Sequence, residues 1–529
     1  MRLQAEGEPA ATTRPEAALF SVYDRAGAVG LARALAARGT AIYATGGTRA
    51  HFAEAGVEVR DVADLTGFPP LFDGRVKTLH PGVFGGILAD RANPLHREEA
   101  ARHGIPVIGT VVVNLYPFES TVARDGATLE EAVEQIDVGG VALIRAAAKN
   151  FAHVSVLVDP SQYAAYLASL PAGPDLGLRR TFATRAFERT AEYDAAIARY
   201  LEAGLLASEL PGSLALTIPL ATALRYGENP QSRAAFYLAR TEERPEQLWG
   251  KALSYNNLLD LDATLRLLVR APMPRGDAEP TARIRAAVVK HTIPCGVAER
   301  PTVASAVRAA LQADAISAYG GIVAVDGALD LEAAELLSEP FLEIVAAPEF
   351  SDEALARLRR KKNLRLIRYG EKLPLKLAGE LQVRSALGGV LAEDEDRAAP
   401  AEVWRVASER TPSAAEWRDL RFAWDVVRHV KSNGVVVARD GVTRGICAGQ
   451  TNRVSAVKIA GIRAGLLAHG GACASDGFFP FADGLEAAAD AGCTAVIAPQ
   501  GSIRDAEVIA AADARGLAFV LSTHRYFLH

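Results

Sequence analysis

The sequence has few cysteines and no long hydrophobic run. Only four of its 529 residues are cysteines, and their positions (Cys295, Cys447, Cys473, Cys493) have no framework spacing. This pattern favours a reducing compartment over a disulfide scaffold. No window approaches the ~20 apolar residues of a membrane span, and the first fifteen residues lack the apolar core of a signal peptide. We therefore expect a cytoplasmic protein.

Common cofactor motifs are also missing. The sequence has no G-x-x-x-x-G-K-[ST] and no strand-linked G-x-G-x-x-G, so neither an ATP P-loop nor a dinucleotide fold is indicated. Pro294–Ala298 resembles the P-C-x-x-C of zinc deaminases, but Ala298 stands where the second thiolate would be. The H-x-E half is missing as well, because His291 is followed by Thr292 and Ile293. A zinc deaminase is thus disfavoured, and we expect no zinc.

Composition and length indicate a multi-domain enzyme or binding protein. Half of the residues are apolar, 23% are charged and the net charge is -5, so nothing global argues for nucleic acid or membrane partners. A chain of 529 residues is too long for one hydrophobic core. We predict a flexible tail at 1–16, one domain at 17–210 and a second at 211–529.

The first domain alternates strand and helix patterns. Ala18–Asp24, Ala41–Thr45 and the nearly continuous apolar run Val107–Leu115 are typical of strands, with amphipathic helices at Gly27–Arg38 and Arg49–Ala55 between them. Continuous apolar strands are buried on both faces. Repeated β-α-β units predict an α/β domain with a parallel sheet.

The second domain contains a weak internal repeat. Asp326-Gly327 and Glu343–Pro348 recur as Asp483-Gly484 and Thr494–Pro499, and Val288–Ala298 has a loose counterpart further on, at 429–438. The repeat predicts two similar α/β halves, roughly 211–385 and 386–529, with a site at their junction.

Five polar motifs fall in loops or element ends of the first domain: Thr45–Thr48, Gly74–Gly82, Asn114–Phe118, Gln135–Gly140 and Ala146–Asn150. Glycines at a helix N-terminus suit an anion, and the edge of an open α/β sheet is where ligands bind. Each motif also has a plain structural interpretation, such as a tight turn, solvated loop charges or a helix cap.

The second domain has a comparable set. Lys290-His291 ends an apolar strand, an unusual place for such a pair, although an exposed lysine and a satisfied histidine are the alternative. Leu224–Pro230 is a polar turn, Lys431–Gly434 precedes a strand, Ala448–Arg453 opens a helix and Ala474–Phe481 sets three phenylalanines beside an acidic turn.

Together these motifs resemble the bifunctional purine biosynthesis family of aminoimidazole carboxamide ribonucleotide transformylase and inosine monophosphate cyclohydrolase, from about Ala17 to His529. The resemblance implies a methylglyoxal-synthase-like domain followed by a duplicated cytidine-deaminase-like domain. It also implies two reactions. A formyl group passes from the co-substrate 10-formyltetrahydrofolate to 5-aminoimidazole-4-carboxamide ribonucleotide (AICAR). The formylated product (FAICAR) then cyclises to inosine monophosphate (IMP) with loss of water.

The resemblance also implies roles for residues of the first domain. The expected catalytic residues are Lys77, Tyr116, Asp137 and Lys149. The expected substrate-binding residues, including the phosphate cradle, are Ser21, Arg25, Thr45, Gly46, Gly47, Thr48, Arg75, Thr78, Asn114, Gly139 and Gly140.

In the second domain Lys290 and His291 are the implied catalytic pair, with Asn433 orienting His291 and the formyl oxygen. The expected ribonucleotide-binding residues are Arg225, Tyr226, Arg453 and Arg525, and the expected folate-binding residues are Tyr319, Phe478, Pro480 and Asp483. The resemblance further implies a homodimer and allows a structural monovalent cation.

Some positions depart from the family pattern. Gln231 and Ser232 follow the R-Y-G-E-N-P stretch where His-Gln is expected, Phe84 replaces a common histidine, and Thr451-Asn452 is atypical. These departures keep open a descendant that retains only one of the two activities. A nucleotide-sensing module without catalysis is a further alternative.

Overall fold

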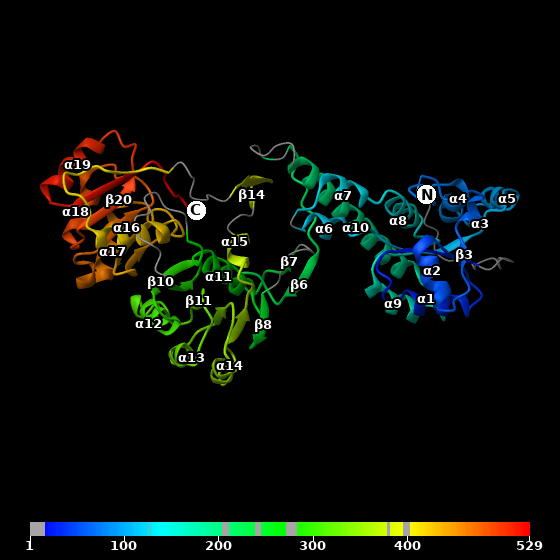
Figure 1. The fold of residues 1–529 in the computed structure, drawn as a ribbon, viewed down its shortest axis with the longest axis horizontal. Helices are drawn as coiled ribbons and strands as arrows, with labels where there is room; N and C mark the ends of the chain where they lie inside the picture. Colours follow the sequence, from blue (N-terminus) through cyan, green and yellow to red (C-terminus); the bar gives the residue numbers. More distant parts are fainter. Residues whose placement is uncertain are drawn as a thin grey trace. The chain divides into compact units, whose positions relative to one another are not determined.

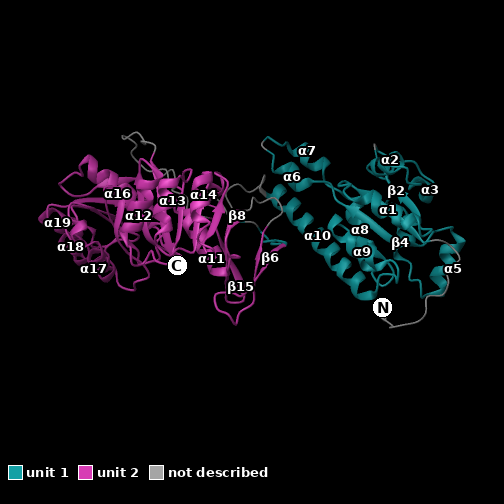
Figure 2. Cartoon of the chain, turned by 90° about the horizontal axis from the view of Figure 1, so that it is seen from below, with its two compact units in different colours: residues 1–219, 239–241 teal, residues 220–238, 242–529 magenta. Residues whose placement is uncertain are grey.

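The chain forms two compact units in a computed structural model, which describes residues 16–72, 74–124, 126–203, 210, 212–238, 245–270, 283–377, 381–394 and 402–529. Unit 1 comprises residues 1–219 and 239–241, and unit 2 comprises 220–238 and 242–529 (Figure 2). The predicted tail lies outside the described residues except for Glu16, and the predicted boundary at 210–211 adjoins undescribed residues. Among the described helices, none is both long and apolar enough to cross a membrane.

Unit 1 is a parallel sheet with helices around it (Figure 1). Its strands are β1 (Ala17–Val22), β2 (Ala41–Ala44), β3 (Arg60–Asp61), β4 (Ile108–Asn114) and β5 (Ser155–Leu157). Its helices are α1 (Ala28–Ala36), α2 (Gly46–Glu54), α3 (Ala63–Thr66), α4 (Pro81–Leu88), α5 (Pro94–Arg102), α6 (Phe118–Val122), α7 (Leu129–Glu134), α8 (Gly139–Lys149), the 3₁₀ turn η1 (Pro160–Gln162), α9 (Tyr163–Ser169) and α10 (Leu176–Ala203).

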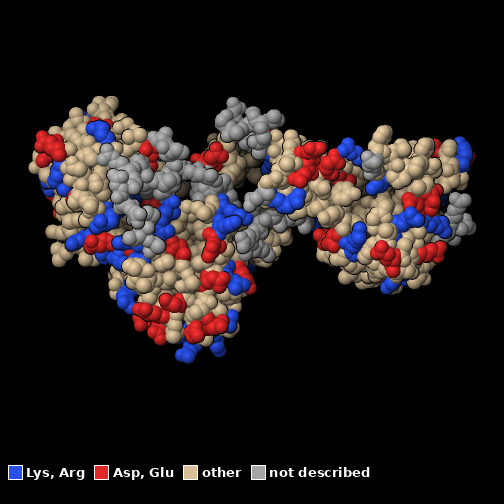
Figure 3. All heavy atoms as spheres, viewed as in Figure 1, with Lys and Arg blue, Asp and Glu red and all other residues tan. Residues whose placement is uncertain are grey.

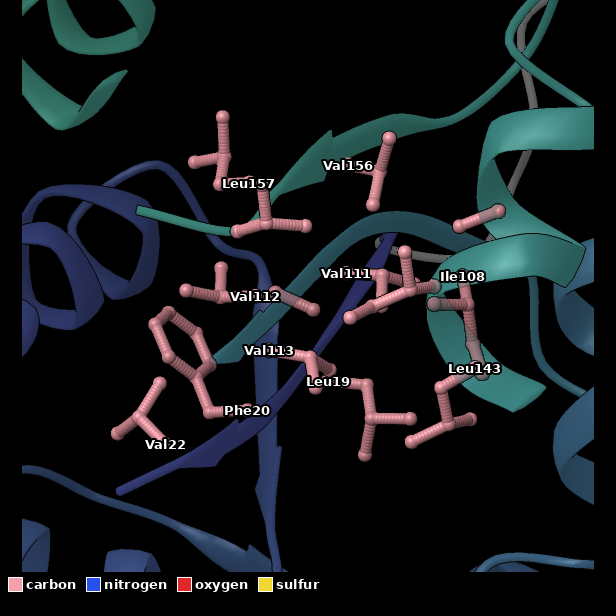
Figure 4. Close-up of a cluster of buried hydrophobic side chains, with 14 of the residues drawn as sticks. Leu19, Phe20, Val22, Ile108, Val111, Val112, Val113, Leu143, Val156 and Leu157 are labelled. Atoms are coloured by element: carbon pink, nitrogen blue, oxygen red, sulfur yellow. The ribbon is translucent and has the colours of Figure 1, made fainter. Parts of the chain in front are cut away.

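The five strands run in the order β3-β2-β1-β4-β5, and every neighbouring pair is parallel. This confirms the predicted parallel sheet. Leu19 and Phe20 of β1, together with Val111 and Val112 of β4, are fully buried among apolar neighbours (Figure 4). The chain reverses its direction of progress across the sheet between β1 and β4, and ligands bind at the carboxyl edge of such a switch point.

Unit 2 is built around a larger mixed sheet. Its strands are β6 (Leu220–Leu224), β7 (Ala234–Tyr237), β8 (Glu246–Trp249), β9 (Ile284–Lys290), β10 (Ile293–Arg300), β11 (Ile322–Val325), β12 (Ile344–Ala347), β13 (Arg365–Arg368), β14 (Gln382–Ala386), β15 (Gly389–Glu393), β16 (Trp404–Val406), β17 (Val435–Arg439), β18 (Val442–Cys447), β19 (Ala472–Ser475), β20 (Ala495–Pro499) and β21 (Ala518–Ser522). Its helices are α11 (Tyr255–Arg266), α12 (Val303–Ala313), α13 (Leu331–Ser338), α14 (Asp352–Leu358), α15 (Leu373–Leu377), α16 (Ala414–Val427), α17 (Arg453–Ala464), η2 (Gly465–Ala468), α18 (Ala482–Asp490) and α19 (Asp505–Ala514).

The order of the twelve strands shows the duplication directly. From the centre outwards, β10-β9-β11-β12-β13-β8 matches β18-β17-β19-β20-β21-β16. The two halves join through the antiparallel pair of β10 and β18 at Ala298 and Val442. The chain therefore contains the same α/β layout twice, which confirms the predicted repeat.

Alternate residues of the strands face opposite layers of helices. Ala287 and Val289 of β9 pack with α11 and α16 on one face. Ala286 and Val288 pack with α12, α13 and α14 on the other. In the second half, α17, α18 and α19 cover the face of the sheet that corresponds to the one covered by α12, α13 and α14 (Figure 1). This alternation follows from the two-residue period of a strand.

The structure corrects two details of the sequence interpretation. Helix α2 begins at Gly46 rather than Arg49. The residues that correspond to one another in the two repeats also differ from those that the sequence suggested. Val323 pairs with Val345 and Cys473 with Val496, so Asp326 corresponds to Asp476 and not to Asp483.

The same strand pairing also changes which segment is the counterpart of Val288–Ala298. The sequence pattern placed that counterpart at 429–438. Val288 pairs with Val323 and Val437 pairs with Cys473, so Val288 corresponds to Val437. The segment at 429–434 instead precedes β17.

Candidate active sites

The N-terminus of α2 meets two cations in unit 1. Thr45 is its N-cap in an extended conformation, so the first N–H groups of the helix have no partner within it. A Cβ on Gly47 would lie 3.0 Å from Nη2 of Arg25, and one on Gly46 would lie 4.0 Å from Nζ of Lys77. Backbone donors, the helix dipole and two cations converge here, as an anion site requires.

Side-chain hydrogen bonds fix the segments around this site. Asn114 accepts from the N–H groups of Tyr23 (2.5 Å) and Asp24 (2.9 Å) and donates to the Asp24 carbonyl (2.8 Å). The Thr48 hydroxyl accepts from Val22 N–H and donates to its carbonyl. Both side chains were predicted to bind substrate, but in the structure their polar atoms hold the β1 end and the loop that carries Arg25.

A pocket opens beside the start of α2. Thr45 donates to the Ser21 hydroxyl at 3.1 Å, which joins the ends of β1 and β2. Three of the predicted site residues line the pocket: Thr45, Gly46 and Lys77. The full lining is Thr45, Gly46, Asp61, Val62, Ala63, Phe68, Pro70 and Lys77. The contribution of 61–70 could not be foreseen, because this segment has no motif of its own.

Asp137 lies at the N-terminus of α8, and its carboxylate accepts from Gly140 N–H at 2.6 Å. A Cβ on Gly140 would lie 2.4 Å from Oδ2 of Asp137, so any larger residue there would displace the carboxylate. Burial raises the pKa of Asp137, and the backbone of Gly140 and the nearby charge of Lys77 oppose this shift. Burial also raises the pKa of Tyr116, with a smaller contribution from Asp137. Lys77, Tyr116 and Asp137 therefore form one interacting group.

Tyr193, on the long helix α10, completes this group. Its hydroxyl accepts from Asp137 N–H at 2.9 Å and donates to the Gln135 carbonyl at 2.7 Å. The side chain is fully buried. Sequence reasoning missed Tyr193 because it lies in the middle of a helix, far from any polar motif.

Other predicted residues of unit 1 lie around this group. Thr78 is buried with its hydroxyl beside Gly139. Arg75 is exposed and forms an ion pair with Glu134 of α7. Lys149 is exposed in the last turn of α8, which is about 15 Å from the Gly139 end for a helix rising 1.5 Å per residue. The structure thus does not bring Lys149 to Asp137.

Phe84, where the family often has histidine, packs against the hydrophobic core of unit 1.

In unit 2 the predicted catalytic pair lies on a tight hairpin. Lys290 is the last residue of β9 and pairs with Ile293, the first of β10, which leaves His291 and Thr292 as the turn. Both turn residues have positive φ, 56° and 60°. Nζ of Lys290 donates to the Tyr319 carbonyl at 2.8 Å. The His291 side chain is exposed at the edge of the sheet.

Asn433 lies on the same edge of the sheet, in the other half. Its backbone N–H and its amide Nδ2 both donate to the Gln450 carbonyl, at 3.0 and 2.6 Å. Strands β10 and β18 separate β9 from β17, so three strand spacings, about 14 Å, lie between the two backbones. Among the described residues no hydrogen bond joins Asn433 to His291.

Arg453 is nearly buried at the start of α17. It forms an ion pair with Asp476, which is fully buried, and donates to the Ser475 hydroxyl at 3.0 Å. A Cβ on Gly477 would lie 2.4 Å from Nη2 of Arg453. Arg453, a predicted ribonucleotide-binding residue, therefore already has an anionic partner. Asn452, an atypical residue for the family, caps α17 by accepting from Ser455 N–H at 3.0 Å.

The C-terminal segment contacts both loops of this half. Tyr526 N–H donates to the Asp476 carbonyl (3.0 Å), and Ser432 N–H donates to the Leu528 carbonyl (2.8 Å). Arg525, a predicted ribonucleotide-binding residue, is exposed, and its guanidinium lies 4.7 Å from the centroid of the Phe527 ring. The segment thus links the Asn433 loop to the Arg453 pair.

The Arg225 loop connects β6 and β7. Arg225 lies over the Tyr226 ring and donates to its hydroxyl at 2.9 Å. Gly227 N–H donates to the Ser232 carbonyl at 2.7 Å, and a Cβ on Gly227 would lie 3.1 Å from that of Ser232. The small Ser232 closes the loop, and Gln231 is exposed at its tip.

The predicted folate-binding residues lie at the same edge of the sheet as Lys290. Tyr319 is 62% exposed and its ring centroid is 5.4 Å from that of Phe341. Phe478, Pro480 and Asp483 are exposed at the end of β19 and the start of α18.

Positive and negative side chains are interspersed over the face drawn in Figure 3, so local groups rather than a single-sign field must select ligands.

Comparison with known proteins decides the family. The model of the AICARFT/IMPCHase bienzyme matches residues 147–463, more than half of the chain, and that of the MGS-like domain matches 27–142. The chain belongs to the AICARFT/IMPCHase bienzyme family. This confirms the resemblance, and the chain is an enzyme of purine biosynthesis with two activities.

Relatives match over nearly the whole chain. The bifunctional purine biosynthesis protein PurH of Chloroflexus aurantiacus is 48% identical and covers 97% of this chain and 98% of its own. That of Cereibacter sphaeroides is 47% identical, with the same coverage. The crystal structure of ForH shares 38% identity over 35% of this chain and 97% of its own, with a TM-score of 0.32.

Proposed function

We propose that each unit carries one of the two reactions: unit 2 transfers a formyl group to AICAR, and unit 1 closes the ring of FAICAR to IMP. The observation that carries this proposal is that each unit gathers its own set of reactive groups. Lys77, Tyr116 and Asp137 interact beside an anion site in unit 1, and Lys290-His291 forms an exposed hairpin in unit 2.

In the formyl transfer, the substrate amine attacks the formyl carbon of 10-formyltetrahydrofolate. A C–N bond forms to the amine, the bond to folate N10 breaks, and the amine proton ends on N10. An imidazole is the usual group for such a proton transfer near neutral pH, so His291 takes the proton during attack. Lys290, directed along the sheet edge by the Tyr319 carbonyl, stabilises the oxyanion or protonates the departing N10.

In the ring closure, the carboxamide nitrogen attacks the formyl carbon of the same molecule, and water leaves. Because the reaction is intramolecular, holding the folded conformer supplies much of the acceleration. The phosphate binds at the start of α2 beside Arg25. Asp137, whose pKa is raised by burial, and Tyr116 exchange protons with the reacting atoms, while Lys77 stabilises the oxyanion.

The remaining roles follow the family resemblance. Arg225, Tyr226 and Arg525 bind the ribonucleotide, and the exposed aromatic residues at the sheet edge receive the folate. Asn114 and Thr48 act by positioning their neighbours, because their polar atoms already bind the backbone of β1 and the loop after it. Arg453 also binds the ribonucleotide, while Asp476 holds its guanidinium through Nη1. We further propose a cytoplasmic homodimer. A structural monovalent cation stays a prediction, and no step above depends on it.

Separate assays of the two steps test the assignment. Wild type, Lys290→Ala and Lys77→Ala are supplied with 10-formyltetrahydrofolate and AICAR, and release of tetrahydrofolate and IMP is followed spectroscopically. Lys290→Ala should stop formyl transfer yet still cyclise added FAICAR, whereas Lys77→Ala should accumulate FAICAR. If wild type cyclises FAICAR but transfers no formyl group, the unit 2 assignment is wrong. Binding of both substrates without turnover would instead indicate a sensing module.

A further inference from the structure

The catalytic hairpin of unit 2 has a structural twin in the other half. His291-Thr292 joins β9 to β10, and Asp440-Gly441 joins β17 to β18, each as a two-residue turn. The φ angles are 56° and 60° in the first turn and 56° and 63° in the second. Positive φ at both central residues is the pattern of a type I′ turn, whose twist suits a hairpin.

The two turns differ in how well their residues suit this shape. Asp-Gly is among the preferred pairs for a type I′ turn. Thr292 is β-branched, and such a residue at positive φ is an outlier. The half with the proposed catalytic residues therefore has the same turn conformation, but its two turn residues, His291 and Thr292, do not favour it. Contacts around the turn must impose its shape.

One such contact is a carboxylate on the helix behind each hairpin. Oδ1 of Asp260 accepts from Thr292 N–H at 2.7 Å. In the other half, Asp419 accepts from Asp440 N–H and Gly441 N–H, both at 2.9 Å. The two aspartates are equivalent, because each follows the serine N-cap of its helix by six residues, at Ser254 in α11 and Ser413 in α16.

Helix α11 also approaches the proposed ribonucleotide loop. Asn256, four residues before Asp260 and so on the same side of the helix, donates to the Glu228 carbonyl at 3.4 Å. Thr292 in turn donates from its hydroxyl to the His291 carbonyl at 2.7 Å. The backbone of His291 is thus tied through Thr292 and Asp260 to the element that adjoins the substrate-binding loop.

We propose that Asp260 is a positioning residue for formyl transfer: it holds the Thr292 N–H and thereby fixes the imidazole of His291 at the sheet edge. Asp419 performs the same structural task for a turn with no proposed part in the reaction. The inference rests on the proposed assignment of Lys290 and His291 to formyl transfer.

The experiment compares the two aspartates in the full-length enzyme. Asp260→Ala, Asp260→Asn and Asp419→Ala are each assayed for kcat and KM of formyl transfer, for cyclisation of FAICAR and for thermal unfolding. Misplacing a reacting group by about 1 Å can slow a reaction on the order of 100-fold, so Asp260→Ala should lower the kcat of transfer by about that factor. The KM for AICAR and the rate of cyclisation should not change.

Asp260→Asn should recover most of the rate, since its amide oxygen can accept the same N–H. Asp419→Ala loses two such bonds and should unfold at a lower temperature, yet retain the wild-type kcat. If Asp419→Ala does not fold, Asp419→Asn takes its place in the comparison.

Three results would overturn the proposal: wild-type kcat in Asp260→Ala, an equal loss of kcat in the Asp419 variant, or a folded Asp260→Asn as slow as the alanine variant. If His291→Ala transfers formyl at the wild-type rate, the assignment of the catalytic pair fails instead.

Discussion

Glu402 offers the most direct test of how the C-terminal segment is held. Its side chain is 5% exposed and accepts four hydrogen bonds. Oε1 accepts from the indole N–H of Trp404 (2.8 Å), that of Trp424 (3.0 Å) and the Ser522 hydroxyl (2.7 Å), and Oε2 accepts from the Tyr526 hydroxyl (2.9 Å). One buried carboxylate therefore joins β16, α16, β21 and the segment that carries Arg525.

The substitution Glu402→Gln keeps the size of the side chain and one oxygen acceptor. A hydrogen bond to a charged group contributes about 1 kcal/mol more than one between neutral groups, so four weakened bonds predict a loss of about 4 kcal/mol in the free energy of unfolding of unit 2. For a unit of about 300 residues this corresponds to a fall of about 6 °C in Tm. Tyr526→Phe removes one of the four bonds and should lose about 2 kcal/mol.

The assay combines thermal unfolding with kinetics of both reactions. Because Tyr526 adjoins Arg525 and bonds to the Asp476 carbonyl, Glu402→Gln should also raise the KM for AICAR in formyl transfer. Cyclisation takes place in unit 1 and should not change. A variant that unfolds within 1 °C of wild type, with an unaltered KM, would refute the argument that this carboxylate holds the segment.

Two further outcomes are expected. Gly74 has φ +89°, and a Cβ there would lie 2.5 Å from Cε of Lys77, so Gly74→Ala should displace Lys77 and slow cyclisation at least tenfold while formyl transfer, assayed in the same preparation, is unaffected. Burial, aided by the charge of Arg428, lowers the pKa of His429 to about 4. The unfolded state, with an ordinary pKa near 6.5, then binds the proton more readily, so stability is complete above about pH 6.5 and falls by about 3 kcal/mol as the pH drops to 4. Urea unfolding at pH 7 and pH 5 should show this slope in wild type, and His429→Gln should lack it.

The helices and strands with a strong hydrophobic period could be predicted from the sequence. The pairing register of the strands, and with it the correspondence between the two repeats, could not. The apolar run at 107–115 is β4 almost to the residue, because a strand buried on both faces needs an unbroken apolar sequence. Helix α2 was predicted to start at Arg49, yet it begins at Gly46, directly after Thr45, which is the N-cap in an extended conformation.

The repeat illustrates the limit of local patterns. Asp326-Gly327 and Asp483-Gly484 share letters, but strand pairing makes Asp326 the counterpart of Asp476. Similar dipeptides recur by chance within a helix or turn, whereas hydrogen-bonded register is set by the whole sheet. For the same reason Asp260 and Tyr193 escaped notice, since their partners are 32 and 56 residues away in sequence.

The proposed reactive residues share a mode of positioning that sequence motifs do not reveal. Asp260 holds the backbone N–H after His291, and Asp137 is itself fixed through its own N–H by Tyr193. Asn114 similarly holds the N–H groups of the loop before Arg25. In each case a buried or half-buried side chain binds a backbone group beside the proposed reactive residue. A backbone N–H is present whatever the side chain, so such a contact can hold the shape of a turn even when the residues of the turn differ. The equivalent hairpins are an example, because one has Asp440-Gly441 and the other His291-Thr292 in the same backbone conformation. The duplicated fold thus allows one hairpin to keep the residues that suit the turn and the other to take up residues that suit the reaction.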